Sequence, residues 1–512
     1  MSTDSTATPA KQIAAGYAVE GKALELGTVV VDGTTDPSAQ VRIPLATVNR
    51  HGLVAGATGT GKTKTLQLIA EQLSAAGVPV LMADVKGDLS GLSRAGESSD
   101  KITARAKETG ETWEASAFPV DFLSLGTRGI GVPVRATIAS FGPILLSKVL
   151  GLNSTQESTL GLIFHYAQEK NYELVDLKDL RAVISKLTSD EGKADLKALG
   201  GVSAQTAGVI LRALVNLEAE GADTFFGEPE LKPKDLLRFD DKGHGVISLL
   251  ELGDQAARPV LFSTFLMWVL SDLFKSLPEV GDVDKPKLVF VFDEAHLLFT
   301  DASKAFLEQV EQTVKLIRSR GVGVFFCTQL PTDVPNEVLS QLGARIQHAL
   351  RAFTPDDQKA LTKTVRTYPK TDVYDLASAL TSLGIGEAVV TVLSERGAPT
   401  PVAWTRLRSP RSLMAAIGDD AIGSAAKSSP LQATYGETKD RESAYEKIEA
   451  EKAAQSAPAE KSAKPGKPAP PAEKKKPGWF KRFVNSRGFQ TFLTAIGREL
   501  VRGMLGNNRR RR

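Results

Sequence analysis

The stretch Gly56-Ala57-Thr58-Gly59-Thr60-Gly61-Lys62-Thr63 (GATGTGKT) decides the fold. It matches the Walker A pattern, in which glycines let successive backbone N–H groups turn inward around phosphates. The helix that follows directs the positive end of its dipole at the same point. In this pattern Lys62 reaches the β- and γ-phosphates of ATP and the Thr63 hydroxyl ligates Mg²⁺. We therefore predict that residues 56–63, together with Lys64, bind the nucleotide.

The sequence on either side of this stretch argues against a glycine-rich turn that matches by chance. Gly52–Ala55 is a short apolar strand, Thr63–Ala76 has apolar residues at helical spacing, and Pro79–Ala83 is a second buried strand. This βαβ unit predicts a parallel sheet covered by helices on both faces. Three polar residues then follow at a strand end near the nucleotide, where they could contact metal, substrate or a neighbouring subunit: Asp84, Lys86 and Asp88.

Another apolar strand is predicted within Lys287–Glu294 (KLVFVFDE), and it ends in two carboxylates. Ligands bind at the carboxyl edge of such sheets, so we predict that Asp293 holds the Mg²⁺ shell and Glu294 polarises the attacking water. A solvated turn is the alternative, and the upstream Walker A motif makes it the weaker one.

A polar residue also follows the strand predicted at Val322–Cys327. A side chain there can sense the γ-phosphate and orient water, and we predict this role for Gln329. The alternative is a helix-capping Thr328 with a bystander glutamine.

Composition places the chain among ordinary globular proteins, with 512 residues, 42% of them hydrophobic and 24% charged. A single cysteine, Cys327, excludes an internal disulfide and fits a reducing compartment. The sequence has no apolar run of about 20 residues and no secretory signal, so we expect a cytoplasmic protein. The five histidines are scattered, so no metal cluster is predicted.

The pattern of residues divides the chain into six segments. These are a disordered N-terminus (1–16), the first part of the ATPase core (17–143), an all-helical insertion (144–240), the second part of the core (241–408), a low-complexity linker (409–478) and a basic amphipathic helix (479–512).

The basic residues concentrate in the C-terminal tail. The net charge is only +3, yet residues 461–512 hold 15 Lys and Arg against two acids. A basic tail with aromatic residues suits contact with its own oligomer, with nucleic acid or with an anionic membrane surface. The sequence leaves these three possibilities open.

Several motifs in order resemble the HerA/FtsK superfamily of P-loop ATPases, and most closely the bacterial HerA-like helicase-domain proteins of the YjgR type. They are GATGTGKT at 56–63, ADVKGDLSG at 83–91, FVFDEAHLLF at 290–299 and the run from Phe325 to Leu361. The resemblance covers roughly residues 17–407 and extends to the basic helix at the end. It implies a RecA-like ATPase core that works as a ring, usually a hexamer, with ATP and Mg²⁺ between subunits.

The resemblance also implies an arginine finger supplied in trans by a neighbouring subunit. Arg351 and Arg345 both follow the sensor strand, with Arg351 slightly preferred. An arginine on a solvated helix face is the alternative for each. One departure concerns the front of the chain, where about 50 residues precede the loop, too few for the β-barrel through which HerA proteins dock a nuclease.

The predicted function is ATP hydrolysis by a ring-forming motor that translocates on or remodels DNA. The alternative is an ATPase that acts on protein partners or an envelope assembly. The letters DEAH at 293–296 suggest an RNA helicase, but such enzymes carry two RecA domains, and only one Walker A and B pair is present here. His296 is then expected to be a capping or subunit-contact residue.

Overall fold

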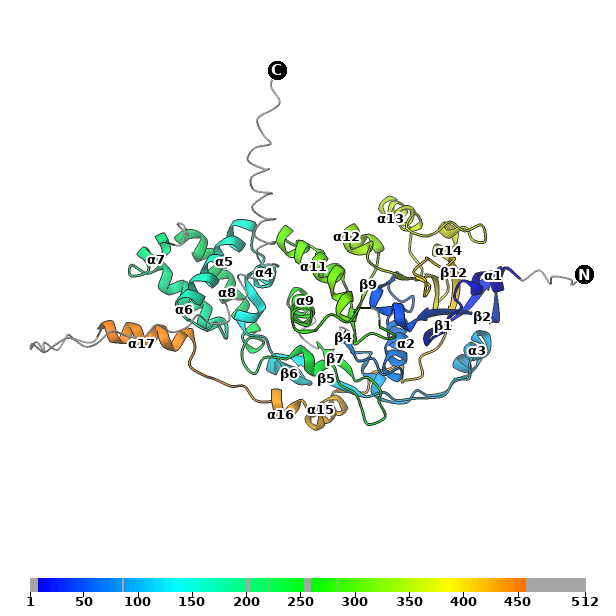
Figure 1. The fold of residues 1–512 in the computed structure, drawn as a ribbon, viewed down its shortest axis with the longest axis horizontal. Coiled ribbons are helices and arrows are strands. Elements are labelled where there is room, and N and C mark those ends of the chain that lie inside the picture. The colour runs from blue at the N-terminus through cyan, green and yellow to red at the C-terminus, as the bar shows by residue number, and fades with distance from the viewer. Residues whose placement is uncertain are drawn as a thin grey trace, which may run out of the picture. The chain divides into compact units, whose positions relative to one another are not determined.

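A mixed sheet organises the chain (Figure 1). The computed structural model describes residues 8–84, 87–198, 203–219, 221–252, 259–281 and 283–456. Within these residues the strands are β1 (Ala23–Val31), β2 (Thr34–Pro44), β3 (Gly52–Ala55), β4 (Val80–Asp84), β5 (Val120–Leu125), β6 (Val132–Val134), β7 (Ile247–Glu251), β8 (Leu288–Phe292), β9 (Val322–Thr328), β10 (Ala344–Gln347), β11 (Glu387–Thr391) and β12 (Ala403–Leu407).

The strand order is β2-β1-β12-β11-β10-β3-β9-β8-β4-β7-β5-β6. From β10 to β6 neighbouring strands run parallel, whereas from β2 to β10 they pair antiparallel. The predicted α/β class with a mostly parallel sheet is therefore confirmed. Four strands were not predicted, because they are short or lack a continuous apolar run: β5, β6, β10 and β12.

Helices cover both faces of the parallel region, as predicted. Along β8, Leu288, Phe290 and Phe292 join one buried cluster. Val289 and Val291 join another on the opposite face. The first cluster packs against α9 (Pro259–Ser276) and α11 (Lys304–Ile317), and the second against α2 (Lys62–Ala75). Such two-sided burial is why these strands read as unbroken apolar runs.

A group of helices follows β6, in the region predicted as an all-helical insertion (Figure 1). They are α4 (Ile138–Val149), α5 (Ser154–Glu169), α6 (Leu177–Thr188), α7 (Lys193–Ala198) and α8 (Ala204–Ala219). Helix α8 packs on both α5 and α6, and α4 also contacts α9 beneath the sheet. Capping boxes at Asn153 and Asp176 start α5 and α6, which explains their sharp beginnings.

The segment 409–456 differs from the predicted linker, and the expectation is wrong for these residues. It forms α15 (Asp419–Ser428), α16 (Gln432–Tyr435) and α17 (Ala444–Ser456). Although its composition is polar, several of its apolar side chains are buried: Ile422, Tyr435, Ala444 and Ile448. We call residues 409–456 the strap.

The strap begins on the helix that follows the phosphate loop. Glu71 of α2 is 1% exposed and accepts hydrogen bonds from Arg411 N (2.8 Å), Ser412 N (3.1 Å) and Ser412 Oγ (2.9 Å). One turn earlier, Gln67 Nε2 donates to Ser412 Oγ (2.8 Å) and Leu413 O (3.0 Å). Polar residues spaced four apart on this helix therefore bind the strap.

The strap ends on the helical group. Ser443 Oγ and Tyr445 N both donate to Asp179 Oδ1 of α6, at 2.6 and 2.8 Å. Between the two ends, Tyr435 O accepts a hydrogen bond from Arg135 Nη1 at 2.9 Å. The strap thus contacts in turn the helix α2, the end of β6 and the helices after it.

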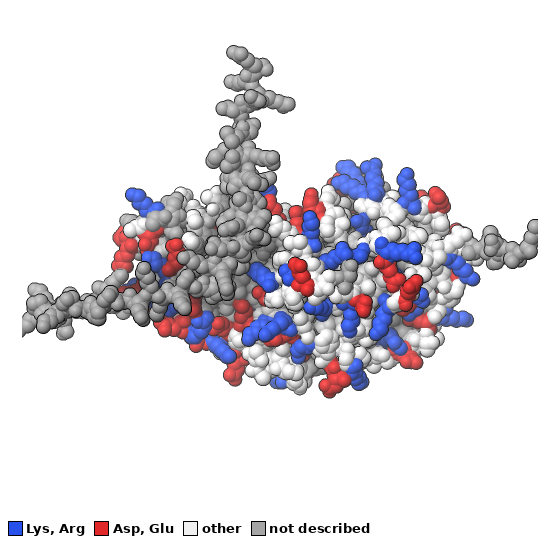
Figure 2. All heavy atoms as spheres, viewed as in Figure 1, with Lys and Arg blue, Asp and Glu red and all other residues white. Residues whose placement is uncertain are grey.

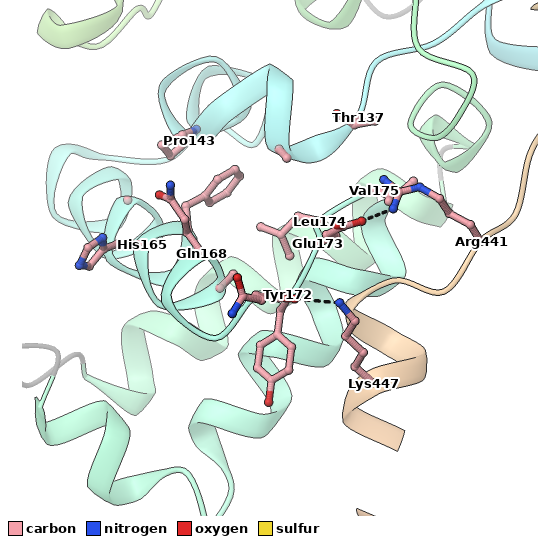
Figure 3. A pocket seen from close by; sticks show the side chains of 15 residues that line it. Thr137, Pro143, His165, Gln168, Tyr172, Glu173, Leu174, Val175, Arg441 and Lys447 are labelled. Carbon is pink, nitrogen blue, oxygen red and sulfur yellow. Dashed lines mark hydrogen bonds and ion pairs between the residues drawn. The ribbon is translucent and has the colours of Figure 1, made fainter. Parts of the chain in front are cut away.

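A cavity of about 770 Å³ lies where the strap meets the helical group (Figure 3). Figure 3 shows Lys447 and Arg441 reaching from the strap toward the chain after α5. Lys447 Nζ donates to Asn171 O at 3.0 Å, and Arg441 pairs with Glu173 and with Glu228. Both cations therefore hold the strap against the body.

The predictions for the two ends of the chain have different outcomes. The N-terminal residues 1–16 were expected to be disordered, but Pro9–Ala15 is the helix α1, which buries Ala10 and Ile13. Thr8 caps it and Pro9 suits its first position, two local signals that the prediction overlooked. Residues 457–478 of the predicted linker and the predicted helix at 479–512 lie outside the described residues.

We predict that Glu71→Ala lowers the free energy of unfolding by roughly 2–4 kcal/mol, because it leaves buried N–H and O–H donors of the strap unpaired. Denaturant unfolding measures the change. Glu114→Ala is the control: Glu114 also pairs with Arg411, at 3.4 Å, but its side chain is 73% exposed. That variant should change stability by less than about 0.5 kcal/mol. Equal effects of the two substitutions would contradict the assignment.

The same contact should depend on pH. Burial raises the pKa of Glu71 from 4.5 to about 7. A raised pKa in the folded chain gives stability that is present below the unfolded value and is lost as the pH rises through the folded one. Wild-type stability relative to Glu71→Gln, which mimics the protonated acid, should therefore fall between about pH 4.5 and pH 7. A constant difference across that range would argue against it.

Candidate nucleotide site

The predicted phosphate loop joins β3 to α2. Gly59 and Gly61 have φ of +81° and +110°, which side chains with a Cβ rarely adopt, and a Cβ at Gly59 would point into open space. Lys62 Nζ donates to Gly56 O (2.7 Å) and Ala57 O (3.2 Å) of its own loop. Glycine at these positions allows the turn that the Walker A pattern needs, and the lysine lies against the backbone carbonyls of its own loop.

The neighbours of β3 bring the other predicted residues to the same edge. β3 pairs in parallel with β9, and β9 with β8, so their carboxyl ends lie side by side. The buried Cys327 thiol lies near the end of β9, where charged groups that follow β3 and β8 both affect its pKa. Burial and Asp293 raise its pKa, whereas the Lys62 ammonium acts to lower it. Lysine and aspartate from distant parts of the sequence thus approach the same sulfur.

Asp293 and Glu294 follow β8 directly. Asp293 Oδ1 accepts a hydrogen bond from Glu294 N at 2.9 Å. Glu294 itself has φ of +48°, an uncommon conformation for a residue with a side chain, which often marks functional sites. Its Oε2 is buried and lies 3.4 Å from His296 Nδ1. His296 is therefore a neighbour of the predicted catalytic carboxylate, a contact that the sequence analysis did not anticipate.

Gln329 is exposed just beyond β9. The preceding Thr328 Oγ1 donates to Asp333 Oδ2 at 2.6 Å, and Leu330 N donates to the same oxygen at 2.9 Å. Thr328 is thus bonded within the turn without capping the short helix after it, whose N-cap is Leu330, and Gln329 lies at the edge that carries the phosphate loop.

The two candidate arginines lie in different surroundings. Arg351 is exposed, and its Nη2 lies 3.4 Å from Thr58 O of the phosphate loop. Arg345 lies within β10, where its guanidinium donates to Thr367 O (2.8 Å) and Leu339 O (3.4 Å). The sequence analysis missed β10, and with it the structural use of Arg345. The geometry favours Arg351 as a residue available to a ligand or a second subunit.

Carboxylates also gather near Lys64. Lys64 Nζ donates to Gln67 Oε1 at 3.1 Å, and burial lowers its pKa while Asp88 and Asp84 oppose that shift. Asp84 is engaged by the backbone N–H groups of Gly87, Asp88 and Leu89, so it orders the turn after β4. Glu251, opposite Asp84 in register, was missed. Burial and the charge of Asp84 raise the pKa of Glu251 to about 8. An acid that ends an apolar strand was the available signal.

Among the described residues, no three His, Cys, Asp or Glu side chains are grouped as a metal-only site would need. Mg²⁺ commonly binds through one or two protein groups together with substrate phosphates and water, so Thr63 and Asp293 fit it as a partner of a nucleotide.

Comparison with known proteins supplies the family. A model of the family described as "Helicase HerA-like C-terminal" matches residues 30–512. The chain belongs to this family. The predicted HerA resemblance is therefore confirmed.

Individual relatives of this HerA-like chain are distant. The DNA double-strand break repair helicase HerA of Saccharolobus solfataricus is 21% identical over 373 residues, which are 71% of this chain and 66% of that protein. HerA of Sulfurisphaera tokodaii is 21% identical over 378 residues, 72% of this chain and 68% of that protein. This chain thus spans 66% of the length of the first relative.

A solved structure shares the fold. The plasmid coupling protein TrwB, in complex with the non-hydrolysable GTP analogue GDPNP, has a TM-score of 0.50 at 15% identity. The match covers 78% of this chain and 98% of that one.

We predict that Arg345→Ala lowers the free energy of unfolding by about 1–2 kcal/mol, because two backbone carbonyls lose a charged donor. Arg351→Ala, at an exposed site, should change it by less than about 0.5 kcal/mol. Denaturant unfolding of both variants measures the difference. A larger loss in Arg351→Ala would show that its contact with Thr58 is structural.

Proposed function

We propose that this HerA-like chain hydrolyses ATP. The observation that carries the proposal is the parallel order β3-β9-β8, which gathers the loop 56–63, Gln329 and the pair Asp293–Glu294 at one edge of the sheet. A phosphate-binding loop beside two carboxylates is the arrangement that phosphoryl transfer to water requires.

Each residue then has a definite role. Lys62 exchanges its bonds with its own loop for the β- and γ-phosphates, and the loop N–H groups bind the remaining phosphate oxygens. Thr63 and Asp293 would hold Mg²⁺, which when bound neutralises charge on the phosphates. Glu294 accepts a proton from the attacking water, and Gln329 orients that water against the γ-phosphate.

We further propose that the chain acts as a ring of identical subunits, with a hexamer as the expected size. Arg351 is exposed beside the phosphate loop, where a residue at a subunit boundary would lie. Two large apolar side chains are also exposed: Phe353, two residues after Arg351, is 86% exposed, and Ile385 is 75% exposed. Gly386, next to Ile385, donates its N–H to Thr60 O of the loop at 3.2 Å. An adjoining subunit that covers these side chains would contact the nucleotide site of its neighbour.

The proposed substrate is DNA, on which the ring translocates or which it remodels. The support is the family and the HerA relatives, which are DNA double-strand break repair helicases. Figure 2 shows basic and acidic side chains intermingled on the face in view, so that face alone does not identify a DNA track. Action on protein partners is the alternative outcome.

Within the described residues, no helix is long and apolar enough to cross a bilayer, and we propose a cytoplasmic location.

We predict that steady-state ATP turnover rises when single- or double-stranded DNA is added at low salt and falls back as salt increases, because phosphate contacts release counterions. In the same assay Lys62→Ala should abolish turnover. Glu294→Gln should bind ATP but hydrolyse it at least about 100-fold more slowly. If both variants kept wild-type turnover, the site would be wrong. Turnover that ignores DNA would instead favour protein partners.

A mixing experiment tests whether Arg351 acts in trans. Lys62→Ala and Arg351→Ala should each be inactive alone, because one lacks the phosphate-binding lysine and the other the finger. When the two are co-assembled, some interfaces combine an intact loop from one subunit with an intact Arg351 from its neighbour. Turnover should therefore reappear in the mixture. A mixture that stays inactive although the subunits exchange would place Arg351 in cis or outside catalysis.

A further inference from the structure

His348 lies directly beneath the phosphate loop and has no part in the roles assigned above. It follows β10, where His348 N donates to Ala55 O at 2.7 Å. The next backbone contact, from Ala57 N to Ala349 O at 2.8 Å, continues the parallel ladder into the loop itself. The backbone around His348 therefore holds the point at which the loop leaves β3.

The His348 side chain then reaches the other end of the loop. Its ring is completely buried, and Nε2 lies 2.9 Å from Thr65 Oγ1 in the first turn of α2. Thr65 Oγ1 also lies 3.3 Å from Gly61 O. One imidazole thus connects, through a single hydroxyl, the neighbouring strand to the glycine that begins the helix.

His348 also lies against two loop glycines. A Cβ at Gly56 would approach His348 Cβ to 2.5 Å, so only glycine allows this close approach at the start of the loop. At the other end, a Cβ at Gly61 would lie 3.7 Å from His348 Cε1, an ordinary van der Waals distance. Contact at the first glycine, the last glycine and the helix makes His348 the floor of the loop.

We propose that His348 is a positioning residue for ATP binding, which sets the curvature of the phosphate loop through its hydrogen bond to Thr65. The backbone N–H groups of the loop are then aimed before the nucleotide arrives, and less conformational freedom is lost on binding. A neutral ring suits the position, since an added positive charge would repel Lys62. Burial and Lys62 lower the pKa of His348 to about 4, which keeps it neutral at ordinary pH.

The experiment measures the Kd of a fluorescent ATP analogue and the thermal midpoint of the nucleotide-free protein. His348→Leu removes the hydrogen bond but keeps apolar volume, and should raise Kd about 10-fold, a loss of about 1.4 kcal/mol. His348→Gln can place an amide near Thr65 Oγ1 and should recover most of the affinity. Thr65→Val should weaken binding like His348→Leu, and the double variant should be no worse than either, because both remove one interaction.

His51 provides a matched control. It is also fully buried, with Nε2 2.8 Å from Val314 O, and burial lowers its pKa to about 4. However, it precedes β3, at the opposite end of the strand from the loop. His51→Asn loses the contact between the imidazole and Val314 O, and should lower the thermal midpoint without changing Kd.

Three results would overturn the proposal. The first is a wild-type Kd in folded His348→Leu. The second is a Kd in His348→Gln no better than in His348→Leu. The third is full additivity of His348→Leu and Thr65→Val. A drop in thermal midpoint with unchanged Kd, as expected for His51→Asn, would assign His348 a purely structural role.

Discussion

The nucleotide site depends on two backbone hydrogen bonds at the start of the phosphate loop. They run from Gly56 N to Thr328 O (3.2 Å) and from Ala57 N to Ala349 O (2.8 Å). They extend the pairing of β3 with β9 on one side and with β10 on the other. The loop therefore leaves a central strand between two neighbours that already fix its direction. The residues proposed to act on the phosphates from outside the loop follow strands on either side of β3: Gln329 follows β9, Asp293 and Glu294 follow β8 beyond it, and Arg351 lies beyond β10.

The strap extends this arrangement beyond the sheet. Its first residues bind Gln67 and Glu71 on α2, and its last helix binds Asp179 on α6. Helix α2 begins at Lys62, so a shift of the helix on nucleotide binding would move the phosphate loop and the start of the strap together. A connection of this kind is a physical route by which nucleotide binding at the loop can affect the helical group.

How far the sequence predicted this structure depends on the kind of signal. Strands β3, β4, β8 and β9 were predicted because both of their faces are buried and they read as unbroken apolar runs. The loop was predicted because its chemistry allows few residues. Strand β10 was missed because ARIQ alternates polar and apolar residues over only four positions. The partners of His348 come from this strand's place beside β3, a long-range fact without a local signature.

The strap is the instructive failure. Its composition suggested a linker, yet a few well-placed apolar residues and backbone donors suffice to hold it, because the body supplies the partners. Glu71 and Gln67 looked like ordinary polar positions on an amphipathic helix. Their buried amide and carboxylate instead form hydrogen bonds with the strap, because buried polar groups need hydrogen-bond partners.

The strap also decides where the chain can be cut or labelled. Leu407, the last residue of β12, is the end point that the strand pattern suggests for a minimal ATPase fragment. A fragment that stopped there would expose the carboxylate of Glu71 and the amide of Gln67, both now covered, and would uncover Asp179 on the helical group. A fragment meant to behave as the native body should keep residues through 456, and a reporter group at a buried strap residue such as Tyr435 or Ile448 would perturb the contacts it is meant to observe.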